Sequence, residues 1–390
     1  MYSKKLIFWA SCLGMLLFGI VLITLGSITP DLKIKLDLSE IESGTLFSIM
    51  PVGILLGSLF FGPLVDNYGY RILLVTSCFL MFAGFEGVAY LQSKELLKVC
   101  IFFIGLGGGA VNGATNALVS DISSNRDKGA NLSLLGVFFG IGALGMPLVL
   151  GLLKTSLPFE PIIAAVGILS FFTAIIYLTI KFPPPKQTQG FPLAQGLTLI
   201  KDRLLLLIAF FLFFQSSLEG ITNNWTTSYL IDHLSVPQSN ALFGLSLLVA
   251  GMVIMRLLLA SIFRSFSTVK IMVTSFILIL LSLLLIKTAI SFYIVLAGLL
   301  LLGGGLAAGF PIMLGIVGSR FSNLSGTAFS FVLVIGLLGN TLVNYGMGII
   351  AQNFGVKYLP SVASGEMALM VIIFYLIMRQ INKSSKQSVN

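Results

Sequence analysis

The sequence predicts an all-α membrane protein whose twelve transmembrane helices form two pseudo-symmetric six-helix bundles. Three observations lead to this prediction: the composition, twelve long apolar segments, and a motif that recurs in both halves. The chain is 57% hydrophobic and only 9% charged, whereas a soluble domain carries about 25% charged residues. Most helices therefore have no aqueous face, which excludes a soluble multidomain protein. The net charge of +9 is not clustered densely enough to follow a nucleic acid backbone.

Twelve apolar segments are long enough to cross a hydrocarbon layer about 30 Å thick. Because backbone polar groups in lipid must bond within the segment, we expect these segments to be helices. The first follows Lys4 and Lys5 and is too long for a signal-peptide core, so we expect it to be retained as a span. The predicted spans are 6–29, 41–64, 72–92, 96–120, 130–153, 160–180, 204–230, 238–263, 269–288, 292–318, 325–350 and 360–379.

The distribution of lysine and arginine predicts the orientation. With the N-terminus inside, about twice as many of these residues lie on the cytoplasmic side as on the outer side. We therefore expect both termini in the cytoplasm and the protein in the cytoplasmic (inner) membrane. The longest connection, 181–203, is rich in proline and lysine. It is predicted to be a cytoplasmic linker between an N-terminal bundle, 1–180, and a C-terminal bundle, 204–390.

A polar turn between two apolar segments recurs in the second half at an offset of 198 residues. A turn at the same place in two hydrophobic halves is typical of a duplicated transporter. The two copies are Gly53, Gly62, Asp66 and Arg71, then Gly251, Ala260, Arg264 and Lys270.

A glycine run also recurs. Gly107–Gly109 with Gly113 is matched by Gly303–Gly305 with Gly309, at an offset of 196 residues. Glycine is costly inside a helix, so matching runs predict close helix packing at equivalent places in the two halves.

The turn from Gly62 to Arg71 resembles the loop 2–3 signature of the major facilitator superfamily. Gly62, Leu64, Asp66, Gly69 and Arg71 match the pattern, whereas Asn67 and Tyr70 depart from it. The resemblance implies the major facilitator fold, in which two bundles rock around a central cavity.

The same resemblance implies a conformational latch on the cytoplasmic side. Asp66 can bond helix-end amides and basic residues of the facing half, and Gly69 permits the tight turn. Because Arg264 replaces Asp66 in the second copy, we expect the N-terminal loop to form the stronger latch. The predicted latch residues are Gly62, Asp66, Gly69, Arg71 and Arg264.

The seventh span carries a narrower resemblance. Glu219, Trp225, Tyr229 and Leu230, with Gly105, Gly107, Asn112 and Asn116 in the fourth span, look like the fucose permease-like branch of sugar:cation symporters. This branch implies uptake of a sugar or related metabolite coupled to H⁺ or Na⁺. In the fucose permease, acidic residues in the first and fourth helices are implicated in coupling, but Gly26 and Asn112 stand there in this chain. Coupling would therefore need Glu219, Glu86 or sodium.

Most acidic residues lie in loops or at span ends, and Glu219 and Glu86 are read as the exceptions. Each lies about 15 residues from the cytoplasmic end of its span, in the outer half of the bilayer. Arg256 is the only basic residue deep in a predicted span. A charge at the bilayer centre costs about 2.5–3.5 kcal/mol on insertion scales, so all three are candidate coupling residues. The alternative for Glu219 is a carboxylate at the outer rim that bonds Asn223. The alternative for Glu86 is a position at the membrane interface, and for Arg256 a side chain that extends toward the inner membrane surface.

Trp225 and Tyr229 are four residues apart and therefore share a helix face. Aromatic rings stack on the apolar faces of sugars, while amides bond sugar hydroxyls. The alternative for both aromatic residues is a belt at the outer membrane interface. The predicted substrate-binding residues are Asn112, Asn116, Gln215, Glu219, Asn223, Asn224, Trp225, Tyr229, Asn340 and Asn344.

Other classes of function are disfavoured. The chain has no phosphate-binding loop motif and no metal or nucleophile constellation inside a span. We therefore do not expect an enzyme, and we expect no catalytic residue and no metal site. The only cofactor expected is the coupling ion. The expected partners are a small-molecule substrate and the lipid bilayer, without nucleic acid, and the expected state is a monomer. The alternative function is proton-coupled export of drugs or other amphipathic compounds, although Met146 between Gly145 and Pro147 departs from the exporter motif.

Overall fold

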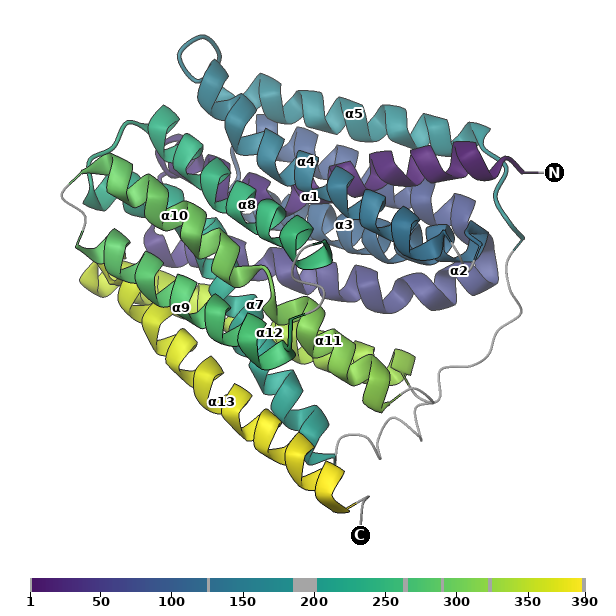
Figure 1. The fold of residues 1–390 in the computed structure, drawn as a ribbon. Coiled ribbons are helices and arrows are strands. Elements are labelled where there is room, and N and C mark those ends of the chain that lie inside the picture. Colours follow the sequence, from purple (N-terminus) through teal and green to yellow (C-terminus); the bar gives the residue numbers. More distant parts are fainter. Residues whose placement is uncertain are drawn as a thin grey trace. The chain divides into compact units, whose positions relative to one another are not determined.

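The computed structural model describes residues 2–124, 127–184, 202–261, 266–288, 291–321 and 325–387. Within these residues the chain is helical and contains no strand, which confirms the predicted fold class (Figure 1). The elements are α1 (Lys4–Leu36), α2 (Glu40–Tyr90), α3 (Lys94–Ile122), α4 (Lys128–Leu153), α5 (Phe159–Thr179), α7 (Arg203–Ser228), a π-helical turn (Tyr229–His233), α8 (Gln238–Ala260), α9 (Thr268–Lys287), α10 (Phe292–Leu306), α11 (Gly309–Arg320), α12 (Ser325–Phe354), a 3₁₀ turn (Val356–Tyr358) and α13 (Leu359–Gln387).

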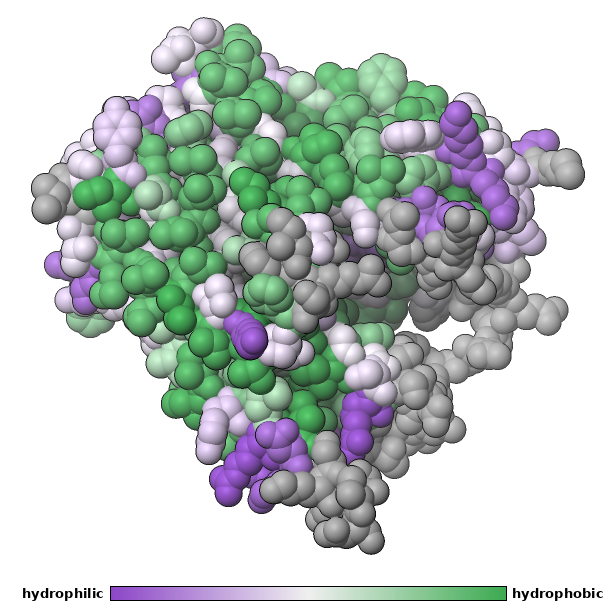
Figure 2. Space-filling model, in the orientation of Figure 1, coloured by the Kyte–Doolittle hydropathy of each residue, from purple (hydrophilic) through white to green (hydrophobic). Residues whose placement is uncertain are grey.

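Twelve helical spans in the described part of the chain are long and apolar enough to cross a membrane. α2 contains two of them, Glu40–Gly62 and Asn67–Tyr90. Helical dihedral angles are interrupted in α2 at Gly69, whose φ of 80° is open to glycine but strained for other residues. Apolar side chains cover most of the face seen in Figure 2. The protein is therefore a multi-pass integral membrane protein, as predicted.

The tenth span departs from the single helix expected over 292–318. It consists of α10 and α11, separated at Ala307 and Ala308. Pro311 accounts for the break, because it has no N–H to bond the carbonyl of Ala307, four residues earlier. Proline is tolerated in the first turn of a helix, and α11 begins two residues before it.

The chain forms two compact units. The first contains α1 to α5 together with Leu230–Ser246, and the second contains α7 and the residues from Leu247 onwards. In the first unit, Asp232 bonds Lys33 at 3.2 Å and Gln238 bonds Asp31 at 2.6 Å, at the end of α1. The predicted bundles 1–180 and 204–390 stay a prediction, since most of the predicted linker 181–203 lies outside the described residues.

The glycine contacts of the first unit recur in the second at a constant offset of 198 residues. A Cβ atom on Gly105 would meet the Met50 carbonyl, and one on Gly303 would meet the Leu248 carbonyl. The backbones of these helices therefore approach too closely for any side chain. The other recurring pairs are Gly53 with Phe102 and Gly251 with Leu300, and Gly107 with Ser77 and Gly305 with Ser275.

These contacts confirm the predicted close packing but correct its register. The offset of 196 residues, which paired Gly107 with Gly303, is wrong by two, because Gly305 is the residue that repeats the contact of Gly107. Consecutive glycines can be aligned in several ways, and only their neighbours distinguish these alignments. A further pair, Gly142 with Leu16 and Gly339 with Phe213, relates α1 and α4 to α7 and α12 at an offset of 197 residues.

Candidate functional site

Helix α7 positions half of the predicted substrate-binding residues. It begins at an N-cap in which the Asp202 carboxylate accepts the backbone N–H of Leu205 at 2.9 Å. The polar side chains of α7 contact several different helices of the second unit. Gln215 is one of them, and its Nε2 donates to the carbonyl of Leu306 at 2.9 Å. This bond gives a partner to the last backbone carbonyl of α10, at the point where the tenth span breaks.

Glu219 on α7 pairs with Arg256 on α8. Glu219 Oε1 lies 3.8 Å from Arg256 Nη2, and the two side chains are 20% and 36% exposed. A partly buried pair of opposite charges avoids the cost of two isolated ions in an apolar medium. Glu219 Oε2 is buried and has no hydrogen-bond partner among the described residues. One carboxylate oxygen is thus held near the guanidinium, and the other still needs a donor.

Asn223 lies one turn after Glu219 on the same face of α7. Its side chain is half-buried, and its Oδ1 has no hydrogen-bond partner in the described part of the chain. Buried acceptors without donors are rare in folded proteins and call for a physical explanation. Glu219 Oε2 and Asn223 Oδ1 are thus two acceptors, one helical turn apart on α7, that lack donors among the described residues.

A chain of amides joins α7 to α12. Asn224 Nδ2 donates to Asn344 Oδ1 at 3.1 Å, and Asn344 Nδ2 donates to Asn340 Oδ1 at 2.8 Å. Asn340 Nδ2 in turn donates to the Ser216 carbonyl at 3.0 Å. Asn344 is fully buried, whereas Asn340 is half-buried. The network therefore fixes α7 against α12 and leaves Asn340 as its most accessible member.

The two predicted aromatic residues lie inside the second unit. Trp225 is 0% exposed and Tyr229 is 3% exposed, and the Tyr229 hydroxyl donates to the carbonyl of Ile286 on α9 at 3.5 Å. Neither side chain is on the surface in this conformation, where a belt residue would lie. Tyr229 also starts the π-helical turn that extends α7 through His233, three residues beyond the predicted span 204–230.

Asn112 and Asn116 lie on α3, which belongs to the first unit. Asn116 Nδ2 donates to the Asn112 side chain at 3.0 Å and to its carbonyl at 2.9 Å. Both side chains are half-buried. In the same unit, Glu86 packs against Gly167 of α5, and its buried Oε1 has no partner among the described residues.

The predicted latch is described in part. Gly69 provides the positive φ expected of the turn, and Gly62 has open space where a Cβ would lie. Arg71 Nη2 donates to the carbonyl of Leu178 at 2.5 Å, which ties the turn to the end of α5. The side chain of Asp66 and the whole of Arg264 lie outside the described residues.

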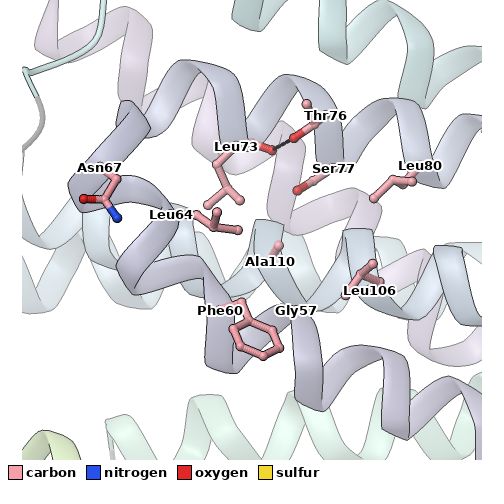
Figure 3. A pocket seen from close by; sticks show the side chains of 10 residues that line it. All are labelled: Gly57, Phe60, Leu64, Asn67, Leu73, Thr76, Ser77, Leu80, Leu106 and Ala110. Atoms are coloured by element: carbon pink, nitrogen blue, oxygen red, sulfur yellow. Dashed lines mark hydrogen bonds between the residues drawn. The ribbon is translucent and has the colours of Figure 1, made fainter. Parts of the chain in front are cut away.

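A cavity of about 360 Å³ lies beside this turn, between both halves of α2 and α3 (Figure 3). Leucine and phenylalanine dominate its lining, and the Thr76 hydroxyl is occupied by the carbonyl of Leu73 at 3.0 Å. None of the predicted substrate-binding residues lines it, and its chemistry suits hydrocarbon better than a polar solute. Its lining residues are Gly57, Phe60, Leu64, Asn67, Leu73, Thr76, Ser77, Leu80, Leu106 and Ala110.

A family model for the Major Facilitator Superfamily matches residues 8–339. The chain belongs to this superfamily. Among curated relatives, an uncharacterized transporter, y4wD, from Sinorhizobium fredii is 25% identical over 347 residues, which cover 87% of this chain and 89% of the relative. A TsgA homolog from Erwinia tasmaniensis is 24% identical over 190 residues, 48% of each chain. This chain thus spans about half the length of the TsgA homolog.

Solved structures of the superfamily share the fold over nearly the whole chain. A mutant of the nucleoside transporter NupG has a TM-score of 0.80 at 16% identity, covering 96% of this chain and 99% of that one. The xylose transporter XylE from E. coli has a TM-score of 0.76 at 15% identity, with coverage of 96% and 99%. Membership of the Major Facilitator Superfamily agrees with the prediction that the protein is not an enzyme.

In this member of the superfamily, sequence reasoning missed one acidic residue inside a span. Glu366 on α13 is 5% exposed, and Ser217 of α7 bonds its Oε1. Glu366 was passed over because it lies near the outer end of the predicted span 360–379, where carboxylates are usually solvated. The signal was present, since Glu366 is the only acidic residue of that segment.

Proposed function

We propose that the protein is a secondary active transporter that moves a small polar solute, a sugar or related metabolite, by alternating access. The observation that carries this proposal is the pair of unsatisfied acceptors on one face of α7, Glu219 Oε2 and Asn223 Oδ1. Hydroxyl groups of a polyol supply the donors that these atoms lack. The half-buried amides of Asn112, Asn116 and Asn340 add further hydrogen-bonding groups, and superfamily membership supports transport as the activity.

The coupling ion of the proposed transporter is H⁺ or Na⁺, as in the fucose permease-like branch that the seventh span resembles. The Glu219–Arg256 pair supports a coupling role, because protonation of the carboxylate removes its attraction for the guanidinium. Glu86, with an unpartnered Oε1 against Gly167, is the second candidate. No other cofactor is proposed.

The proposed transporter is a monomer in the cytoplasmic (inner) membrane, with both termini in the cytoplasm and the lipid bilayer as its surroundings. The asymmetry of lysine and arginine supports this orientation.

A thermal-shift screen of the purified protein tests the substrate class. A ligand that binds only the folded state raises the melting temperature. At a ligand concentration of 100 times the dissociation constant, it adds about 2.7 kcal/mol to the free energy of unfolding. We expect sugars and related polyols to raise it, and organic acids and hydrophobic cations to leave it unchanged. Stabilisation by hydrophobic cations alone would instead favour the alternative, proton-coupled export of amphipathic compounds.

The latch is a further part of this proposal. Asp66→Ala is expected to shift the protein toward the inward-open state, because it removes the acceptor that closes the cytoplasmic side. Spin-label distances across the cytoplasmic mouth measure this shift. Distances that match those of the wild-type protein would rule out a latch at Asp66.

A further inference from the structure

Glu366 is the acidic side chain that the described structure buries most completely, at 5% exposed. It lies on α13, seven residues after Leu359, which is about 10 Å along the helix axis. Its neighbour across the helix interface is Ser217 of α7, whose Oγ bonds Glu366 Oε1. A buried carboxyl group at the interface of two transmembrane helices is expensive unless it has a function or a neutral charge state.

The geometry of Ser217 bears on where the proton is. Ser217 Oγ lies within hydrogen-bonding distance of both Glu366 Oε1 and the carbonyl oxygen of Phe214, the latter at 3.1 Å. A hydroxyl has one proton, and a carbonyl oxygen can only accept. When Ser217 donates to Phe214, its contact with Glu366 requires a proton on the carboxyl group. A neutral carboxylic acid therefore allows the contacts of Ser217 with Phe214 and with Glu366 Oε1 to form at the same time.

Among the described residues, no cation forms an ion pair with Glu366. Its Oε2 is buried without a hydrogen-bond partner in the described part of the chain. A carboxylate in this setting would carry the full cost of desolvation. The elements packed on α13 are α7, α9 and the 3₁₀ turn before it. The ionisable residues of α7 are Arg203 and Glu219, and those of α9 are Lys270 and Lys287. The 3₁₀ turn contributes Lys357 and Tyr358.

Glu219 does not share this site. It is two residues from Ser217, and two residues correspond to about 200° around an α-helix. Glu219 pairs with Arg256 of α8, whereas Ser217 contacts α13. In the described part of the second unit, Glu219 and Glu366 thus lie on different sides of α7, the first paired with a cation and the second without one.

We propose that Glu366 and Ser217 form a proton-binding site between α13 and α7. In this conformation the Glu366 carboxylic acid donates to Ser217 Oγ, and Ser217 donates to the Phe214 carbonyl. When water enters the α7–α13 contact, the acid transfers its proton to water, and Ser217 turns to donate to the carboxylate that remains. A coupling role for this site rests on the proposed transport function, whereas proton binding does not.

Infrared difference spectroscopy on the purified protein tests the site with solvent protons as the only probe. We expect the wild-type protein at neutral pH to have a carboxylic acid C=O band that is lost in Glu366→Gln. The same band should shift to higher frequency in Ser217→Ala, because the acid loses its acceptor. Glu219→Gln is the matched control and should retain it. A carboxylate band in place of the acid band would overturn the proposal.

Transfer to D₂O separates an exchanging site from a sealed one. Deuteration should shift the Glu366 band, since the proposal requires contact with water during opening. A band that stays unshifted after prolonged incubation would identify a purely structural acid and overturn the release step. If Glu366→Gln does not fold, Ser217→Ala still tests the proposal, because the carboxylic acid C=O band should shift to higher frequency in that variant.

The two proposals fail separately in these experiments. If the acid band shifts in D₂O but no sugar stabilises the protein, the proton-binding site is supported and sugar transport is contradicted. A protein stabilised by sugars that has no acid band would retain the transport proposal and discard the site.

Discussion

Helices α1 and α7 occupy corresponding places in the two units, yet the polar side chains in their middle turns have different kinds of partner. The contact of Gly142 with Leu16 on α1 recurs as that of Gly339 with Phe213 on α7. In α1, hydroxyls donate within the helix, as Thr24 does to the carbonyl of Ile20 at 2.6 Å. Such bonds satisfy the hydroxyl without specifying any neighbour.

In α7, polar side chains contact four other helices. Gln215 bonds the end of α10, Ser217 bonds Glu366 of α13, Glu219 pairs with α8, and Asn224 bonds Asn344 of α12. At an offset of 197 residues, Leu22 of α1 stands at the position of Glu219. Duplication has therefore preserved the backbone packing of the two units, while the polar contacts that suit a solute or an ion are concentrated around one of the paired helices.

The largest expected effect comes from removing the charge that distinguishes α7. Glu219→Gln should abolish uphill accumulation in proteoliposomes of whichever solute the thermal-shift screen selects, while exchange of that solute remains. The amide keeps the shape of the carboxyl group but can neither be protonated at neutral pH nor pair with Arg256. Thr24→Val in α1 is the control and should accumulate the solute like the wild-type protein. Unchanged accumulation in Glu219→Gln would remove its coupling role.

The second prediction concerns what the two units share. Gly303→Val and Gly105→Val should each destabilise the fold by about 3 kcal/mol, because the new side chain meets a carbonyl oxygen of the neighbouring helix. Melting temperatures of the purified variants measure the loss. Gly304→Ala is the matched control, since its Cβ would have only an ordinary contact, 3.6 Å from the end of Met255. A large loss in only one unit would break the correspondence between them.

The sequence was sufficient to predict the fold but only part of the candidate site. Span length and the glycine repeat are local properties, so the twelve spans and the close packing followed from them. Partners across helices are different, because a sequence gives the position of Asn224 along α7 but not which helix that side chain faces. Glu366 was missed for this reason, since its burial depends on α7. Pro311 stood in the sequence as a signal for the break between α10 and α11.

A smaller effect is expected from the amide network. Asn344→Ala should cost about 1–3 kcal/mol, because it leaves the buried Asn224 amide without its acceptor and removes one hydrogen bond between α12 and α7. Asn116→Ala on α3 provides the comparison and should cost about 0.5 kcal/mol, since its bonds to Asn112 lie within one helix. Chemical or thermal unfolding of both variants tests the difference. Equal losses would indicate that the network does not join α7 to α12.

The smallest effect is expected at the break in the tenth span. Pro311→Ala restores an N–H that can bond the carbonyl of Ala307, and alanine favours a helix. We expect α10 and α11 to become more continuous, with slower hydrogen exchange at Ala308 to Ile312 and a change in stability of about 1 kcal/mol or less. Hydrogen exchange measured by mass spectrometry on peptides covering this segment tests whether exchange slows in Pro311→Ala.

Gln215→Leu supplies the complementary test of that break, because it removes the donor that occupies the Leu306 carbonyl at the end of α10. If Pro311 alone causes the break, Gln215→Leu leaves exchange at Ala308 to Ile312 as it is, and Pro311→Ala slows it. If exchange responds only to Gln215→Leu, the hydrogen bond from α7 holds the helix open. The break would then be another consequence of the polar contacts that set α7 apart from α1. The continuous α3 would lack a break because Phe18 of α1, at the position of Gln215, offers no such donor, rather than because of proline.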